Sequence, residues 1–254
     1  MCKNELLKHF LALSLLLTAC GSSTQPKPEA DSTLPSAHVD PATAGTISGK
    51  VSFEGAAPQM PVIDMSSNPQ CERQHTAPAK GQTVVVNSNH TLRNVFIWIK
   101  DGLPKARWTP PAEAATLDQR GCIYEPHVLG MMAGQQLEIL NDDPVNHNVH
   151  AEAQINQAWN ESQRPKAEHK FKTFESSEIL IPMSCSVHPW MRSYIGVAPN
   201  PYFAVTGDDG SFTLKNVPPG VYTIEAVHEK YGRKEGKLTL TPSGTATIDF
   251  SYGS

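Results

Sequence analysis

Three potential metal ligands lie close together in the heptapeptide Cys185-Ser186-Val187-His188-Pro189-Trp190-Met191. On either side of it are short runs rich in β-branched residues, Glu178–Ile181 and Tyr194–Val197, and we expect both runs to be β-strands. The heptapeptide is then the loop that joins them. A thiolate, an imidazole and a thioether on one loop predict a site for a metal ion that accepts soft ligands.

A second imidazole is expected from the end of an earlier strand. The string His147-Asn148-Val149-His150 follows the apolar run Leu137–Leu140 through a short polar loop. Two histidines, one cysteine and a weakly bound axial methionine form the ligand set of blue-copper electron-transfer sites. Such a set predicts one copper ion that alternates between Cu(I) and Cu(II). The spacing itself leaves both His147 and His150 as candidates.

The N-terminal residues predict export from the cytoplasm. Lys3 and Lys8 precede an apolar run, Phe10–Leu17, which is too short to span a bilayer. The run ends in Leu17-Thr18-Ala19-Cys20, which resembles the lipobox of bacterial lipoproteins, where the cysteine carries lipid after cleavage. An ordinary secretory signal followed by an accidental cysteine is the alternative, and it also places the mature chain outside the cytoplasm.

The cysteine count predicts one disulfide and one free thiol. Of the five cysteines, Cys2 leaves with the signal peptide and Cys20 is the predicted lipidation site. Three remain, an odd number in an oxidising compartment. We pair Cys71 with Cys122, a bond that contributes roughly 4 kcal/mol in the loop-entropy description. Cys185 is left free to bind metal.

The folded part of the chain has an all-β pattern. Strands are expected at Thr46–Phe53, Thr83–Val86 and Asn94–Ile99, where apolar and β-branched residues either alternate or are dense. The weak exception is Pro111–Leu117, whose Ala-Glu-Ala-Ala sequence could form a turn or two of helix. The segment Glu152–Lys172, between the two ligand loops, is long and polar.

The C-terminal part consists of regular predicted hairpins. Asp209-Gly210-Ser211-Phe212 and, a few residues later, Pro218-Pro219-Gly220-Val221-Tyr222 resemble the signature of the carboxypeptidase regulatory-like (transthyretin-like) sandwich. That resemblance implies a structural or ligand-presenting module without chemistry of its own. The run Ile47–Val51 resembles the opening strand of the same module. The sandwich could therefore be discontinuous, with the metal-binding domain inserted into it.

Residues from about Gly121 to Val197 resemble the one-copper cupredoxins, such as amicyanin and plastocyanin, in which H-N-V-H and C-x-x-H-P-x-M occur together. The resemblance implies that the first histidine of the string binds copper and that His150 does not. It also implies that Asn148 ties the two ligand loops together. The implied copper ligands are His147, Cys185, His188 and Met191.

Two further residue roles come from the same resemblance. In cupredoxins the histidine of the C-x-x-H loop shows its ring edge to solvent in an apolar patch where a redox partner docks. Pro189 and Trp190 are the implied docking residues here, unless Trp190 only packs beneath the loop. His127 is expected to be structural, because the corresponding strand is remote from the copper.

The predicted fold is therefore all-β, a cupredoxin-like Greek-key barrel plus a small antiparallel β-sandwich. The predicted ranges are 1–19 for the signal peptide, 20–45 for a disordered tether rich in Ser, Thr, Pro and Ala, 46–197 for the copper domain and 198–254 for the regulatory-like sandwich. Strand 46–54 is the open point, since it fits either domain.

The expected function is the transfer of single electrons between redox protein partners outside the cytoplasm, with a lipid anchor at the membrane, on the periplasmic side in a Gram-negative cell. Copper storage or delivery without redox chemistry is the alternative. An oxidase or nitrite reductase is disfavoured, because such enzymes need further histidine-built copper sites. The net charge of −4 does not suggest a nucleic-acid partner. A cupredoxin fused to a regulatory-like module also resembles proteins labelled methylamine-utilization proteins, although no residue here indicates amine oxidation.

Overall fold

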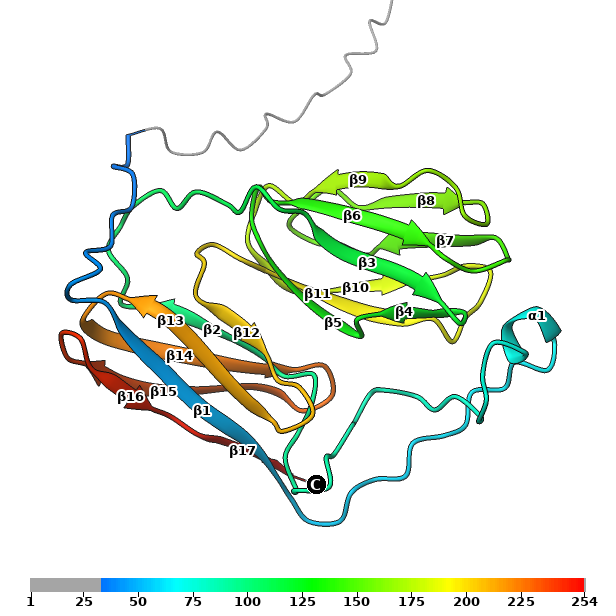
Figure 1. Ribbon diagram of the computed structural model, residues 1–254, viewed down its shortest axis with the longest axis horizontal. Coiled ribbons are helices and arrows are strands. Elements are labelled where there is room, and N and C mark those ends of the chain that lie inside the picture. The colour runs from blue at the N-terminus through cyan, green and yellow to red at the C-terminus, as the bar shows by residue number, and fades with distance from the viewer. Residues whose placement is uncertain (1–32, 254) are drawn as a thin grey trace, which may run out of the picture. The chain divides into compact units, whose positions relative to one another are not determined.

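The computed structural model describes residues 33–253, which form an all-β fold with one short helix, α1 (Pro69–Glu72), so the predicted all-β class is confirmed (Figure 1). The strands in chain order are β1 (Gly45–Glu54), β2 (Phe96–Asp101), β3 (Ala115–Arg120), β4 (Ile123–Glu125), β5 (Val128–Met132), β6 (Gln136–Asn141), β7 (His147–Ala151), β8 (Trp159–Gln163), β9 (Lys170–Thr173), β10 (Glu178–Ser184), β11 (Arg192–Ala198), β12 (Phe203–Val205), β13 (Ser211–Val217), β14 (Gly220–His228), β15 (Gly232–Leu240), β16 (Thr245–Thr247) and β17 (Phe250–Gly253).

These strands form four sheets that pair into two sandwiches. The first, which we call the frame sandwich, combines the sheet β13-β1-β16, with β17 also paired to β1, and the sheet β12-β2-β14-β15. The second, the inserted sandwich, combines β5-β11-β10-β7-β8 with β4-β3-β6-β9. All strands of the inserted sandwich lie between β2 and β12 in the chain. The frame sandwich is therefore built from two separate stretches of the chain, which was one of the two arrangements that the strand near residues 46–54 allowed.

Alternation along β1 explains why this strand belongs to the frame. Ile47, Gly49, Val51 and Phe53 are buried, while the alternate residues Ser48, Lys50 and Ser52 are less so, as expected for a strand with one face on a core. Their side chains share a core with Ile97 from β2 and Ile224 from β14. The predicted boundary of 46–197 for the copper domain is thus corrected, because β1 and β2 pair with C-terminal strands.

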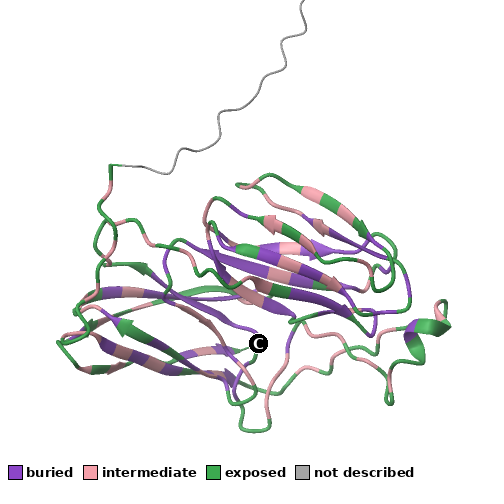
Figure 2. Cartoon of the chain, turned by 45° about the horizontal axis from the view of Figure 1, so that its top comes forward, coloured by how far each residue is buried: buried purple, intermediate pink, exposed green. Residues whose placement is uncertain are grey.

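A separate core fills the inserted sandwich. It includes Leu117 and Ile139 from one sheet and Ile181 and Ile195 from the other. Figure 2 shows buried residues running along the strands of both sandwiches. A small third cluster, built around Phe96, Trp98, Val128 and Ala198, joins β2 of the frame to β5 and β11 of the insert. Gly196 is needed at this junction, since a Cβ there would lie 2.5 Å from ring carbons of Phe96.

The chain between β1 and β2, residues 55–95, carries α1 away from the frame and toward the inserted sandwich (Figure 1). We call this segment the β1–β2 excursion. Its return end stays at the frame through an isolated bridge from Thr91 to Ser52 of β1, and a second bridge, from Leu92 to Val86, lies within the excursion itself. The expected strand Thr83–Val86 is reduced to this bridge. The polar helix α1 has no apolar periodicity and was not predicted.

Other differences from the predictions follow from local contacts. The long polar segment between the ligand loops contains β8 and β9, whose alternate residues face outward. The residues expected to turn helically near Pro111–Leu117 instead lead into β3. The tether was predicted to extend to residue 45, but Ala37 and Pro35 exchange backbone hydrogen bonds with Arg107. The signal peptide, Cys20 and the first part of the tether lie outside the described residues.

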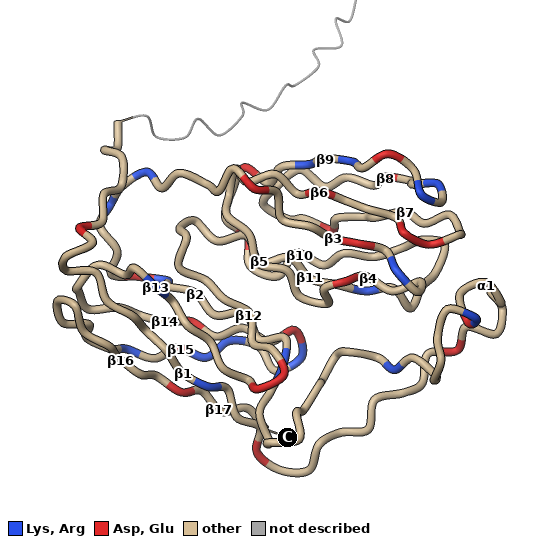
Figure 3. The backbone as a smooth tube through the Cα atoms, viewed as in Figure 1, with Lys and Arg blue, Asp and Glu red and all other residues tan. Residues whose placement is uncertain are grey.

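Within residues 33–253, no helix has the length and apolar character needed to cross a membrane. Figure 3 shows basic and acidic residues interspersed along the backbone of both sandwiches.

Candidate metal centre

The heptapeptide forms a tight loop between β10 and β11. Cys185 directly follows the last residue of β10, and Met191 directly precedes β11. The loop is closed by a hydrogen bond from the Met191 backbone N–H to the His188 carbonyl, at 2.9 Å. The His188 backbone N–H also points at Cys185 Sγ, 3.4 Å away. The cysteine and histidine are therefore held by paired strands rather than by a free loop.

The loop before β7 positions His147, which is the first residue of that strand. Asn141, at the end of β6, fixes this loop by donating side-chain hydrogen bonds to the carbonyls of Val145, Gln163 and Arg164. β7 pairs with β10 through His150 and Ser184, so the two ligand loops lie at the same end of one sheet.

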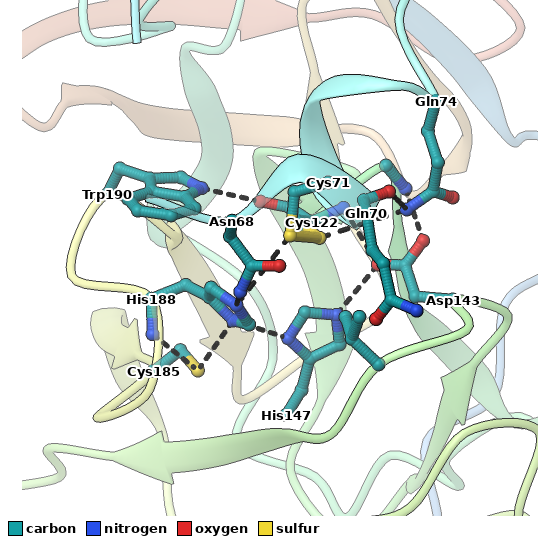
Figure 4. The surroundings of a disulfide bond; sticks show 12 residues. Asn68, Gln70, Cys71, Gln74, Cys122, Asp143, His147, Cys185, His188 and Trp190 are labelled. Atoms are coloured by element: carbon teal, nitrogen blue, oxygen red, sulfur yellow. Dashed lines mark hydrogen bonds and ion pairs between the residues drawn. A yellow bond between two sulfur atoms is a disulfide. The ribbon is translucent and has the colours of Figure 1, made fainter. Parts of the chain in front are cut away.

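The ligand atoms of three predicted ligands converge at one buried point (Figure 4). His147 Nδ1 lies 2.9 Å from His188 Nδ1, and Cys185 Sγ lies 4.0 Å from the same nitrogen. All three atoms lie within 4.8 Å of one another, and the three residues are at most 4% exposed. Bonds of about 2.0–2.3 Å, as at zinc sites, hold ligand atoms at separations of this size.

The hydrogen bonds of the two imidazoles leave both Nδ1 atoms suited to a metal. His147 Nε2 lies 2.7 Å from Asp143 Oδ2, so this nitrogen carries the proton and its Nδ1 keeps a lone pair. His188 Nε2 lies 2.7 Å from the side-chain amide of Asn68, whose oxygen and nitrogen can exchange places to accept an N–H. The donor set of two imidazoles and a thiolate therefore fits one ion with a preference for nitrogen and sulfur.

Asp143 is the residue that fixes His147, and it was not predicted. Its carboxylate accepts hydrogen bonds from the backbone N–H groups of Gly121 and Cys122 as well as from His147. Burial would raise the pKa of this carboxyl, but these hydrogen bonds hold it below its usual value. An ionised Asp143 orients the imidazole and makes it a stronger ligand. Its place four residues before His147, on the same loop, was the available signal.

Burial and mutual contacts shift the pKa values of the three converging ligands. Burial raises the pKa of the Cys185 thiol, but hydrogen bonds from His147 and from backbone N–H groups bring it below its ordinary value. Burial lowers the pKa of His147, yet its bond to Asp143 carries that pKa above the usual range. Burial and the adjacent His147 lower the pKa of His188.

Asn148 lies between the two ligand loops, as the cupredoxin resemblance implied. Its side-chain oxygen accepts a hydrogen bond from the Ser186 backbone N–H at 2.7 Å and lies 3.4 Å from Cys185 Sγ. Its amide nitrogen donates to Asn160 Oδ1 at 2.6 Å. The same residue thus links β7, β8 and the heptapeptide.

Met191 is fully buried and belongs to the same core cluster as Cys185. Its role as the axial ligand stays a prediction.

The outer edge of His188 is covered. Its Nε2 atom faces Asn68 and lies 3.6 Å from Cys71 Sγ, and the ring is 1% exposed (Figure 4). Cys71 is bonded to Cys122, as predicted, which joins the β1–β2 excursion to the inserted sandwich. The expectation that this ring edge is open to solvent is therefore corrected. Asn68 could not have been found by motif, because it lies 120 residues from His188 in the chain.

The two predicted docking residues differ in exposure. Pro189 is exposed, whereas Trp190 is partly buried, with its ring 5.1 Å from the His188 ring. The Trp190 indole N–H donates to the Cys122 carbonyl at 2.9 Å. Trp190 thus packs between the ligand loop and the disulfide, and of the two predicted docking residues only Pro189 offers open surface.

Of the remaining histidines, His150 is part of the β7 ladder and is not among the converging ligands of the described residues. His127 pairs with Glu229 at the junction between the sandwiches, consistent with the structural role expected for it. His169 pairs with Glu138 on the surface.

Comparisons with known proteins found likeness only at the level of solved structures. No protein-family model matches the chain, and no curated protein matches it. A Cu-containing nitrite reductase from Thermus scotoductus is 22% identical, with a TM-score of 0.32, over 34% of this chain and 22% of that one. The matched region thus spans under a quarter of that reductase.

Two smaller proteins match over nearly their whole length. A purple cupredoxin from Nitrosopumilus maritimus is 20% identical, with a TM-score of 0.29, and covers 34% of this chain and 100% of its own. A reduced Cu(I) form of an amicyanin variant is 22% identical, with a TM-score of 0.31, and covers 38% of this chain and 98% of its own.

Proposed function

We propose that this chain is a mononuclear type 1 copper protein that transfers single electrons between redox partners outside the cytoplasm. The observation that carries the proposal is the convergence of His147 Nδ1, Cys185 Sγ and His188 Nδ1 at one buried point, with Met191 in the adjoining core. Two imidazoles, a thiolate and a weak axial thioether are the ligand set of blue-copper sites. Bound copper would supply a one-electron change between Cu(I) and Cu(II).

The surrounding residues support electron transfer because they hold the ligands in place. Asp143 fixes the His147 ring, and Asn148 joins the two ligand loops. Ligands that do not move when the charge of the ion changes keep the reorganisation energy low. The site is also closed to water, since its three converging ligands are at most 4% exposed.

The proposed context is a lipid anchor at Cys20 that holds the chain at a bacterial membrane outside the cytoplasm, on the periplasmic side in a Gram-negative cell. Pro189, exposed beside the ligand loop, is the proposed contact for a redox protein. The frame sandwich would then present the copper domain without taking part in chemistry, and the protein would act as a carrier rather than a catalyst.

The visible spectrum of the Cu(II) form tests the proposal. The purified chain with one equivalent of copper should show an intense thiolate-to-copper charge-transfer band in the visible range. Cys185→Ser should abolish that band, because serine offers no thiolate.

Ser186→Ala is the matched control, since Ser186 is exposed and is next to Cys185. The variant keeps the backbone N–H that Ser186 donates to Asn148 at 2.7 Å and loses only the longer contact, 3.4 Å, from Asn148 Nδ2 to Ser186 Oγ. It should leave the band within experimental error. A colourless Cu(II) form of the wild-type chain would contradict the proposal and favour storage or delivery of copper.

A further inference from the structure

His188 presents its two ring nitrogens to two different groups of sulfur atoms. Nδ1 faces Cys185 Sγ at 4.0 Å, within the proposed copper centre. Nε2 faces Cys71 Sγ at 3.6 Å, on the opposite side of the ring (Figure 4). The disulfide therefore lies directly behind a metal ligand rather than at a distance from it.

The second group of sulfurs is itself arranged as a metal site. One ligand atom each from Cys71, Cys122 and His188 lies within 4.8 Å of the other two. Both cysteines are fully buried and His188 is 1% exposed. Joined in a disulfide, the sulfurs are poor ligands. As thiolates they belong to the soft class that selects Cu(I).

We propose that Cys71 and Cys122, when reduced, bind a second copper ion as Cu(I), next to the His188 ring. A dithiol reductant breaks the S–S bond, takes the oxidising equivalents as its own disulfide and leaves two protein thiols. Binding of Cu(I) then releases the two thiol protons, and the copper itself is neither oxidised nor reduced.

The geometry of the cysteines allows the change. Their Cα atoms lie 5.5 Å apart, so the two sulfurs can turn toward one ion after the bond opens. Cys122 is anchored to the inserted sandwich, because its backbone N–H donates to Asp143 and its carbonyl accepts from Trp190. Cys71 is on α1 in the β1–β2 excursion, whose local links to the insert include a 2.7 Å bond from His75 Nε2 to the Gly121 carbonyl.

Reductant access requires the excursion to open, because neither sulfur is exposed. Residues 69–74 comprise α1 and the turn that follows it, and all of them except Cys71 are exposed. Segments with few buried contacts open locally at low free-energy cost. The turn around Cys71 can therefore admit a small dithiol while the sandwich that holds Cys122 stays folded.

Copper stoichiometry tests the proposal in the full chain. The disulfide form and a form reduced with dithiothreitol and then desalted under nitrogen are each titrated with Cu(I) against a coloured Cu(I) chelator. The reduced form should bind one Cu(I) ion per chain more than the disulfide form. The Cys71→Ser/Cys122→Ser variant should bind the same number of Cu(I) ions before and after treatment with dithiothreitol. The double serine variant keeps Cys2 and Cys20, so any change that reduction causes at these two cysteines appears in that variant as well.

Cys185→Ser separates this proposal from the electron-transfer proposal. It removes the first copper centre but should retain the extra ion that appears on reduction. Three results would overturn the second site: equal stoichiometry in the two forms, an extra ion that persists in the double serine variant, or loss of the far-ultraviolet β signal on reduction. Failure of the blue-copper band with retention of the extra ion would overturn only the proposed electron transfer.

Discussion

Glu225 in the frame sandwich and Asp143 in the inserted sandwich are both carboxylates with fully buried side chains. Glu225 accepts hydrogen bonds from Trp98 Nε1 and from the side chains of Lys100 and Arg233, all on the same sheet. Asp143 accepts from two backbone N–H groups and from His147. One network ends in cations at the surface, and the other ends in a nitrogen lone pair aimed at the metal centre.

The difference shows that the partners of a buried carboxylate indicate its role better than its pKa does. Burial alone would raise the pKa of both carboxyls, and in both cases hydrogen bonds hold it below the usual value. The direction of the pKa shift therefore does not separate them. The two carboxylates differ in the group that their hydrogen-bond networks reach, which is a pair of surface cations for Glu225 and the His147 imidazole for Asp143. We expect buried polar groups of the frame to govern stability, and those of the insert to govern copper binding.

The largest expected effect concerns another buried polar group of the frame, His228. This residue is 1% exposed, and its Nδ1 accepts hydrogen bonds from the backbone N–H groups of Lys230 and Tyr231. Burial lowers its pKa to about 4. In the unfolded chain the pKa of this histidine is about 6.5, so between pH 6.5 and 4 the unfolded chain binds a proton at this position and the folded chain does not. The free energy of unfolding should therefore fall between pH 6.5 and 4, by up to roughly 3 kcal/mol.

Urea unfolding of the metal-free chain at pH 7 and near pH 4 measures this loss. His228→Phe, which fills the same space without a titrating group, should remove about this part of the pH dependence. If the free energy of unfolding of His228→Phe falls between pH 7 and pH 4 as much as that of the wild-type chain, other groups govern the stability in acid.

The next effect is that of Glu225→Ala. It leaves the buried Trp98 N–H without an acceptor and removes the partner of Lys100 and Arg233, whose side chains can still reach water. We expect the free energy of unfolding to fall by about 2 kcal/mol, measured by urea denaturation, with the copper spectrum unchanged. Glu235→Ala is the control, because this half-exposed residue binds the same Lys100, and it should cost less than about 1 kcal/mol. A changed spectrum in Glu225→Ala would break the distinction between the sandwiches.

The last effect concerns copper affinity rather than folding, and it is expected for Asp143→Ala. Without the carboxylate, the His147 ring loses its orientation, and changes of this kind weaken metal binding by about 10–100-fold. Competition with a chelator measures the change, and even the tenfold limit, about 1.4 kcal/mol, is detectable. Asp142→Ala provides the comparison, because its half-exposed carboxylate only pairs with Arg120. Equal affinities in the two variants would mean that Asp143 serves the fold alone.

Much of this organisation could be predicted from local sequence. The strands around the heptapeptide form where β-branched residues are dense, and the ligand spacing survives because β10 and β11 hold both ends of the loop. Cys71 and Cys122 could be paired because the cysteine count left Cys185 for metal. These features depend on residues close together in the chain or on the number of cysteines.

The cover over His188 could not be predicted, for a physical reason. It is made by α1 and by Asn68, in a polar segment whose residues have no periodic pattern. Their position depends on one covalent bond to Cys122 and a few long-range hydrogen bonds. The same is true of the domain boundary, since β1 has an ordinary strand pattern and only its partners, β13, β16 and β17, reveal which sandwich it joins.

The pairing of β1 with β17 also sets the order in which the protein can be assembled. The backbone N–H of Lys50 binds the side chain of Asp249, 199 residues later in the chain. Contacts between such distant residues form slowly. The inserted sandwich needs only β3 to β11, so it can fold as a unit while the frame still waits for its final strands. The inserted sandwich would thus fold first, and the frame sandwich would be completed last, when β16 and β17 pair with β1.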